Sequence, residues 1–268
     1  MKRKRLSWIL AIVAMGCLAG TARTQEITGN HRLVESFIQD GAILRQGWLE
    51  AGAGYSDWGG GGHDFAAGTL VAFSALERLE VGGRVSYLDR TRSRNEVLFG
   101  ERLSSDIDEN GLGDLDLYGK FRFGTHPRDW SAGLVVKIPA GDDRERLGSG
   151  RTDYAVFLAT RRTFEEFAWI GNASVRVNGD SRTPGGGSGK MSGSLGGGAI
   201  FRISYSWSFM AEARYETRRY EGGDVDFRIT PSLDFRPTEN LALRLGVALG
   251  LADGSPDQEA AFSVVFHF

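Results

Sequence analysis

Apolar side chains occupy every second position in many segments of this chain. Between residues 241 and 251 every odd position holds leucine or valine, and every even position holds alanine, glycine or arginine. Residues 260–268 alternate in the same way, with phenylalanine at positions 262, 266 and 268. Successive side chains of a β-strand point to opposite faces, so this period of two predicts strands with one apolar and one small or polar face.

Twelve segments of the chain show this alternation. They are residues 49–55, 65–73, 79–87, 115–123, 130–138, 154–158, 167–177, 195–203, 207–216, 225–236, 241–251 and 260–268. Pro231 lies within one of them and has no N–H for the strand ladder, so it predicts a local irregularity. An even number of strands is what single-chain bacterial barrels have.

The connections between these segments alternate in length. Five are short, near residues 77–78, 125–128, 165–166, 205–206 and 237–240, and six are longer, at 56–64, 89–110, 141–150, 179–190, 218–223 and 252–257. A barrel inserted from one side of a membrane has short periplasmic turns and longer external loops. The sequence therefore predicts an all-β fold over residues 47–268, a closed antiparallel transmembrane β-barrel of about twelve strands.

The faces opposite the apolar ones carry many charges. In a barrel these side chains would line a watery or hydrogen-bonded lumen, where opposite charges on neighbouring strands can pair. The candidate lumen-lining residues are Asp114, Asp116, Lys120, Arg122, Lys137, Arg176, Arg202, Glu212, Arg214, Glu216, Asp226, Arg228 and Arg244. A soluble β-sandwich also alternates and would expose the same charges to solvent, so the strand pattern by itself leaves that alternative open.

Aromatic residues stand near the ends of several predicted strands. They are Trp48, Tyr87, Trp130, Trp169, Trp207 and Phe235. Amphipathic rings favour the headgroup zone of a membrane, so we interpret these residues as a girdle. Ordinary core aromatics are the alternative.

The first 22 residues predict export. Basic residues at 2–5 precede an apolar run at 6–19 and small residues at 20–22, which is the form of a cleaved signal peptide. A retained membrane anchor and a lipoprotein acylated at Cys17 are the alternatives. Export would take the chain through the inner membrane to the bacterial outer membrane. There its partners would be lipid, lipopolysaccharide and the assembly machinery, which we expect to recognise the terminal Phe268.

Residues 26–46, within the segment 23–46 that links the signal peptide to the barrel, do not alternate. Leu33, Val34, Phe37 and Ile38 have the spacing of a short helix. The segment is either a periplasmic arm or a plug folded into the lumen, and the sequence leaves both open.

Composition narrows the classes of function. The whole chain has a net charge of −2, and removing four basic residues with residues 1–22 leaves 28 basic against 34 acidic residues, or −6. Basic residues are scattered among acidic ones, so no nucleic-acid partner is expected. Cys17 is the only cysteine, so a chain cleaved after Ala22 has neither a disulfide nor a thiolate metal site. No later apolar run is long enough for a membrane helix.

Four short stretches resemble a known family. They are residues 111–115 (GLGDL), 119–122 (GKFR), 137–142 (KIPAGD) and 147–154 (LGSGRTDY). Together they resemble the outer-membrane family named after the meta-pathway of phenol degradation, over about residues 111–268. The resemblance implies an outer-membrane barrel that passes small aromatic or apolar compounds, and it carries over no functional residues. The N-terminal third departs from the family's pattern.

Candidate chemistry is sparse. His63 and Asp64 lie near Ser56 in the first predicted loop, which suggests a lipid hydrolase, but serine and aspartate are ordinary loop residues. The glycine runs at 59–62 and 185–187 lack the strand, helix and Lys-Ser/Thr of a phosphate loop. Two predicted loops carry acidic residues that would either bind calcium or only face solvent: Asp106, Asp108, Glu109, Asp142 and Asp143. His267 alternates onto the lumen face.

These observations predict a channel or transporter for small solutes, with no enzymatic activity, cofactor or metal. A non-conducting barrel with a structural or surface-binding role is the first alternative. A barrel that hydrolyses lipids is the second.

Overall fold

The computed structural model describes residues 31–35, 38–43, 46–59, 62–98, 101–124, 128–182 and 187–268. The predicted signal peptide lies outside these residues. The described part contains thirteen strands: β1 (Trp48–Asp57), β2 (Gly62–Leu76), β3 (Leu79–Leu98), β4 (Glu101–Leu112), β5 (Leu115–Arg122), β6 (Arg128–Ile138), β7 (Asp153–Thr163), β8 (Phe167–Val177), β9 (Met191–Arg202), β10 (Trp207–Glu216), β11 (Asp226–Thr238), β12 (Leu241–Gly250) and β13 (Gln258–His267). Among the described residues, no helix has the length and apolar character to cross a bilayer.

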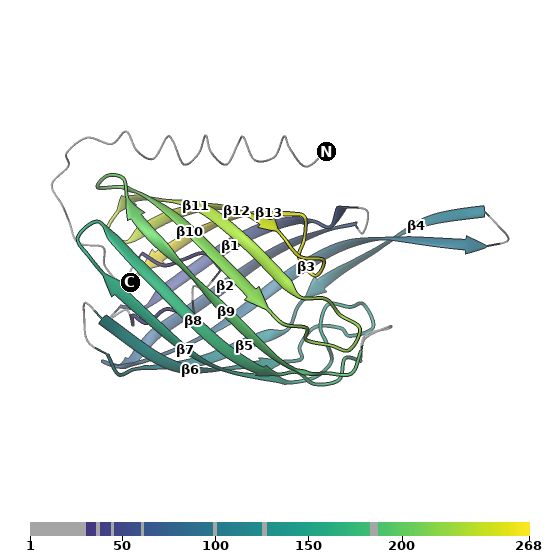
Figure 1. Cartoon of the computed structure of the whole chain (residues 1–268), viewed down its shortest axis with the longest axis horizontal. Helices are drawn as coiled ribbons and strands as arrows, with labels where there is room; N and C mark the ends of the chain where they lie inside the picture. The colour runs from purple at the N-terminus through teal and green to yellow at the C-terminus, as the bar shows by residue number, and fades with distance from the viewer. Residues whose placement is uncertain are drawn as a thin grey trace.

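The strands form one closed antiparallel barrel (Figure 1). The last strand β13 pairs with the first strand β1, from Trp48 opposite His267 to Asp57 opposite Gln258. Strands β4 and β5 both pair with β3, at its second and first halves respectively, so together they fill one position in the wall. The barrel therefore has twelve positions, which confirms the predicted fold class.

Short turns gather at one end of the barrel and longer loops at the other. Because Trp48 and His267 are paired, the barrel begins and ends at the short-turn end. Two predicted loops are wrong in extent. Residues 56–64 are mostly strand, and residues 89–110 are not a loop but the outer part of a long hairpin made by β3 and β4, which reaches beyond the barrel (Figure 1).

The β3–β4 hairpin escaped the hydrophobic pattern because apolar residues do not alternate along residues 89–98 and 101–110. Its ladder continues through backbone pairing, with Asp89 opposite Asn110 and Thr91 opposite Asp108. The Thr91 hydroxyl also donates a hydrogen bond to Asp108 at 2.8 Å. A strand that leaves the membrane needs no apolar face, so periodicity cannot detect it.

The outward side chains are large and apolar. Leu245 is 54% exposed, Val156 58% and Phe262 48%, and the neighbouring inward residues Arg244 and Ser263 are buried. This inversion of a soluble protein's pattern is what a hydrocarbon surround requires. It argues against the soluble sandwich, in which these faces would pack on a second sheet.

Outward aromatic residues mark two levels of the barrel. Near the short turns the Trp207 ring packs against Phe235 with ring centres 4.6 Å apart, and near the loops Tyr215 contacts Phe227 edge-on at 6.5 Å. Trp207 and Tyr215 lie eight residues apart on β10, roughly 27 Å along the strand. Barrel strands tilt by roughly 35–45°, so this length corresponds to about 20 Å along the barrel axis, somewhat less than the apolar band of about 25 Å.

Two details of the sequence analysis are settled by the strand ladders. The ladder between β11 and β12 is interrupted at Pro231, as its missing N–H predicts, whereas the register shift falls between Phe235 and Thr238. Trp48 is not a girdle residue, because its side chain points inward and is 0% exposed. Trp48 and Leu49 are consecutive residues of β1, so their side chains point to opposite faces of the wall. Leu49 faces outward, and Trp48 therefore faces the lumen.

Candidate functional site

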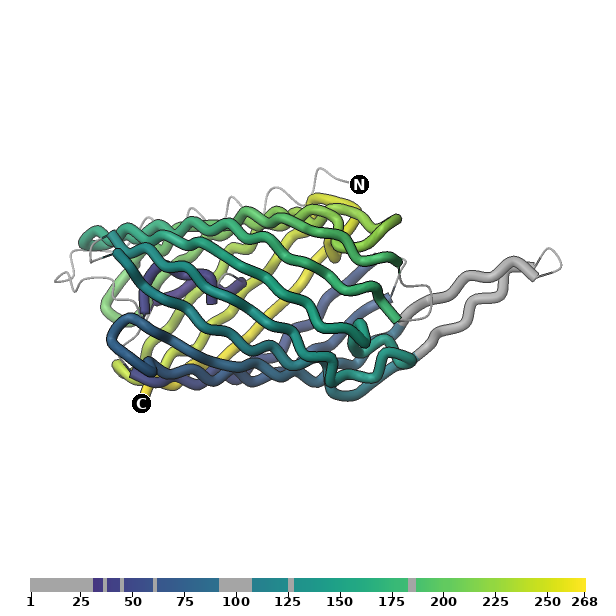
Figure 2. Tube along the Cα trace, turned by 90° about the horizontal axis from the view of Figure 1, so that it is seen from below, coloured from purple at the N-terminus to yellow at the C-terminus, as the bar shows by residue number. Residues whose placement is uncertain are grey.

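Residues 31–35 and 38–43 form an inner segment within the barrel near its short-turn end (Figure 2). Leu33 packs with Ile170, Ile200 and Met210 of the wall, and Ile38 packs against the cluster that contains Trp48. Apolar contacts inside a mostly polar lumen fix the position of the segment along the barrel axis.

A buried carboxylate on β3 holds the inner segment. Glu80 accepts hydrogen bonds from Arg32 at 2.9 Å and from the Tyr118 hydroxyl at 3.1 Å, and its Oε1 lies 3.1 Å from Lys120 Nζ. Arg32 and Lys120 also donate to the carbonyl of Ala42. Burial alone would lower the pKa of Arg32, but Glu80 raises it above its ordinary value. Buried charges require such partners, because removing them from water is costly.

A second buried ion pair joins the segment to β7. Asp40 Oδ2 is 2.7 Å from Arg161 Nη1, and both side chains are fully enclosed. Arg161 also donates to the His31 carbonyl at 2.9 Å, and the Ser131 hydroxyl donates to the Asp40 carbonyl at 3.0 Å. The segment is therefore tied to strands β6 and β7 as well as to β3 and β5.

Glu35 completes the ring of contacts. Its N–H donates to Glu212 at 3.0 Å, and its carboxylate accepts from the Thr230 hydroxyl and lies 3.7 Å from Arg228. These partners belong to β10 and β11. Strands on every side of the barrel thus hold the same short stretch of chain.

His31 lies among cations. Burial, together with Arg236, Arg161, Arg202 and Arg244, holds its pKa well below the usual value. Its Nδ1 has no hydrogen-bond partner among the described residues. The neutral imidazole is therefore the form that fits this position.

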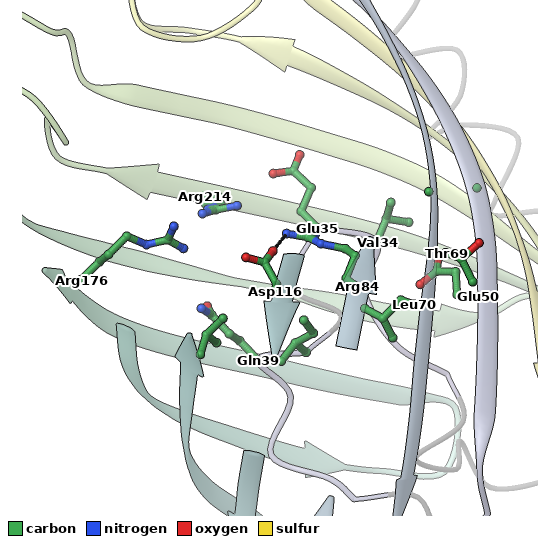
Figure 3. A pocket seen from close by; sticks show the side chains of 14 residues that line it. Val34, Glu35, Gln39, Glu50, Thr69, Leu70, Arg84, Asp116, Arg176 and Arg214 are labelled. Atoms are coloured by element: carbon green, nitrogen blue, oxygen red, sulfur yellow. Dashed lines mark hydrogen bonds and ion pairs between the residues drawn. The ribbon is translucent and has the colours of Figure 1, made fainter. Parts of the chain in front are cut away.

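A cavity of about 250 Å³ lies on the loop side of the inner segment (Figure 3). Val34, Glu35, Ile38 and Gln39 contribute one side of it. The rest of the lining comes from the wall: Glu50, Gly52, Gly68, Thr69, Leu70, Arg84, Asp116, Val135, Arg176 and Arg214.

Most charges at this level are paired. Arg84 donates to Asp116 at 2.5 Å, and Arg214 donates to Glu216 at 2.9 Å. Arg176 makes no hydrogen bond or ion pair with any other described residue. On one side of the cavity, therefore, a guanidinium group has no direct hydrogen-bond or ion-pair partner among the described residues.

None of the thirteen predicted lumen residues is exposed. Lys120, Glu212, Glu216 and Arg244 are buried, and Asp114, Asp116, Arg122, Lys137, Arg176, Arg202, Arg214, Asp226 and Arg228 are half-buried. The fold brings Asp116, Arg176 and Arg214 together at the cavity. It sends Lys120, Glu212 and Arg228 to the inner segment instead.

Most of the remaining predicted residues form ion pairs with side chains that do not line the cavity. Lys137 lies 2.6 Å from Asp153 and 3.3 Å from Asp114, and Arg122 lies 3.7 Å from Asp129. Asp226 pairs with Arg228 at 2.6 Å, Arg244 lies 3.6 Å from Asp234, and Arg202 has partners of its own. Networks of this kind stiffen a lumen wall.

Sequence reasoning missed several residues that organise the lumen. Glu80 and Arg84 share the polar face of their strand, yet no pattern singled them out from other charges. Arg161 lies beyond the apolar stretch by which β7 was detected. Arg32 and Asp40 belong to the non-alternating segment, for which no strand pattern exists.

The histidines do not form a hydrolytic site among the described residues. The His63 ring stacks on Tyr55 at 5.6 Å, and Asp64 accepts a hydrogen bond from the Trp58 indole at 3.0 Å. His63 makes no hydrogen bond with Ser56 or Asp64 in the described part of the chain. His267 is buried on the lumen side of β13.

No family model matches the chain, and no curated protein matches it. Solved structures do. The COG4313 outer membrane channel from Pseudomonas putida F1 is 14% identical with a TM-score of 0.61, over 85% of this chain and 97% of that one. The NanC porin is 10% identical with a TM-score of 0.56, over 82% and 98%. The transport unit of the autotransporter AIDA-I from Escherichia coli is 12% identical with a TM-score of 0.53, over 84% and 90%. At these identities the likeness is one of fold, and the fold is that of an outer-membrane β-barrel.

Proposed function

We propose that this protein is an outer-membrane channel for small solutes. The observation that carries the proposal is a closed barrel with an apolar outer surface and a charged lumen that holds an open cavity. Charged rings along a lumen are a common basis of solute selectivity.

The inner segment acts as a plug in this proposal. Residues 1–22 serve as the signal peptide, residues 23–46 carry the plug, and residues 47–268 form the barrel. The contacts of Arg32, Glu35 and Asp40 with five different strands support the plug over a free periplasmic arm. Solute would pass when the segment shifts, or through space left beside it.

Membership of the family named after the meta-pathway of phenol degradation is part of the proposal. The fold of the COG4313 channel is compatible with it. Outer-membrane lipid and lipopolysaccharide would then surround the barrel, and assembly machinery would recognise the terminal aromatic Phe268. The aliphatic side chains in the cavity lining support a solute with an apolar part.

The direct test is the current through single molecules of refolded protein in a planar lipid bilayer. We expect discrete conductance steps from the full mature chain, and larger steps after deletion of residues 31–43, because the plug would be gone. Heat-dependent gel migration identifies the folded fraction of both proteins. Absence of current in both folded proteins would contradict channel function.

A sealed, non-conducting barrel is the second candidate. The buried ion pairs of Glu80 and Asp40 across the short-turn end favour it, because they leave little room for water there. Conductance by the deletion variant alone would indicate a plugged channel. Zero conductance by both would indicate a sealed barrel.

A further inference from the structure

The lining of the cavity is asymmetric in charge. Figure 3 shows Arg176 and Arg214 at one side of the cavity and Glu50 at the other, with the Glu35 carboxylate and the Arg84–Asp116 pair between them. Arg214 and Arg219 both bind Glu216, at 2.9 Å and 2.5 Å. Glu216 is thus already engaged by two guanidinium groups, and Arg176 lies within its electrostatic reach.

The charge balance of this corner is positive. Arg176, Arg214 and Arg219 carry three positive charges, and Glu216 carries one negative charge, which leaves a local charge of +2. Arg84 and Asp116 neutralise each other across the cavity. The Arg176 guanidinium is half-buried and has no direct partner among the described residues, so its N–H donors are available to a ligand. These donors are fixed in a fork that matches the two oxygens of a carboxylate.

Apolar side chains line the same cavity. Val34 and Ile38 come from the inner segment, and Leu70 and Val135 come from β2 and β6. The volume of about 250 Å³ is smaller than the roughly 300–1,000 Å³ of sites for drug-sized ligands. The cavity therefore suits a solute of one ring or a short chain.

We propose that the cavity is a binding site for small monocarboxylates with an apolar body. The carboxylate binds the guanidinium groups of Arg176 and Arg214, and the apolar body contacts Val34, Ile38, Leu70 and Val135. This inference deepens the proposed channel function, and it names the solute class that the channel would select. Binding at this site also places the solute directly against the inner segment.

Arg176 is a favourable residue for a test because it makes no contact that the fold depends on. Arg176→Gln removes the charge and keeps most of the side-chain volume. Arg176→Lys keeps the charge but not the bidentate fork. Arg122→Gln is the matched control, since Arg122 is also a lumen arginine but does not line the cavity.

The probe is sodium benzoate, titrated by calorimetry into the full mature chain refolded in detergent, with benzyl alcohol as the neutral analogue. We expect benzoate to bind about tenfold more tightly than benzyl alcohol, and Arg176→Gln to weaken benzoate binding about tenfold. Arg176→Lys should give an intermediate affinity, and Arg122→Gln should match the original chain. Equal affinity for the two probes, or benzoate binding that Arg176→Gln leaves unchanged, would overturn the site.

Conductance measurements distinguish the proposed binding site from the proposed channel function. Benzoate binding in a barrel that passes no current would support the site and contradict the channel. Current through a barrel whose benzoate binding does not depend on Arg176 would support the channel and overturn the site. In a conducting barrel, benzoate should also reduce the ionic current, and Arg176→Gln should raise the concentration needed about tenfold.

Discussion

At the scale of single residues, the lumen is organised by charges that are enclosed rather than hydrated. Glu80 faces two cations and a phenol, and Asp40 faces a buried arginine. A buried pair gives little net stability by itself, but removing one member leaves the other charge without a partner. Substitutions at these positions are therefore sharper probes than substitutions of surface charges.

Glu80→Ala should destabilise the folded barrel by about 3–5 kcal/mol, because Arg32 and Lys120 would remain buried without their carboxylate. Urea unfolding in lipid vesicles measures the free energy of unfolding. Glu77→Ala is the control, since Glu77 is exposed in the adjoining turn and its loss should change stability little. Equal stability of the two variants would show that Glu80 does not hold this network together.

The lipid-facing residues give a depth-dependent prediction. Leu245 lies in the middle of β12 and faces outward, so Leu245→Arg should cost about 2–4 kcal/mol of unfolding free energy. Leu251→Arg, just beyond the end of the same strand, should cost about 0–1 kcal/mol. The same unfolding assay compares them. A cost independent of depth would mean that hydrocarbon does not surround this strand.

At the scale of elements, the inner segment is a short irregular chain held by a regular wall. It makes backbone and side-chain hydrogen bonds to several strands but pairs with none as a strand. Its position depends on discrete ion pairs and on the neutral state of His31. Such an element can be released without disturbing the strand pairing, which closes the ring of the barrel without it.

Acidification should release the inner segment. The pKa of His31 is lowered in the folded lumen by burial and by Arg236, Arg161, Arg202 and Arg244, whereas a released segment has an ordinary pKa near 6.5. The released state therefore binds more protons, and docking is favoured above about pH 6.5 and weakened as the pH falls below it.

Conductance recorded between pH 7.5 and 5.5 tests this prediction. Current should rise as the pH falls, and His31→Gln should flatten the dependence because glutamine does not titrate. A pH response that persists in His31→Gln would assign it to another group.

At the scale of the whole molecule, closure of the sheet matters most. Pairing of β1 with β13 over ten residue pairs leaves no free edge in the wall. Every backbone group in the membrane can then be satisfied within the sheet, which is the condition for strands to cross a bilayer. The apolar exterior and the charged interior follow from the same alternation, once the ring is closed.

Closure predicts resistance to detergent. An unboiled, membrane-extracted sample should migrate differently from a boiled one on a detergent gel, because heat is needed to open the ring. The comparison needs no knowledge of the solute. Identical migration, or recovery of the folded chain free in the periplasm, would contradict the membrane barrel.

The pattern of residues by itself determined the barrel, the strand count and the polarity of the inner faces. The period of two determines which side chains share a face of a strand. The lengths of the connections determine at which end of the barrel each one lies. Both features can therefore be read from local sequence. Leu241 to Leu251 and the terminal strand show this most clearly. The long hairpin of β3 and β4 was missed, since a strand outside the membrane carries no such period.

Only the tertiary structure decided which lumen charges meet. Asp116 and Lys120 share one face of β5, yet one lines the cavity and the other binds the inner segment. Arg176 makes no hydrogen bond or ion pair with another described residue. This property depends on which side chains the closed barrel places beside it. Pairing across a lumen depends on the curvature of the sheet and on the path of residues 31–43, and neither is encoded in the spacing of residues along one strand.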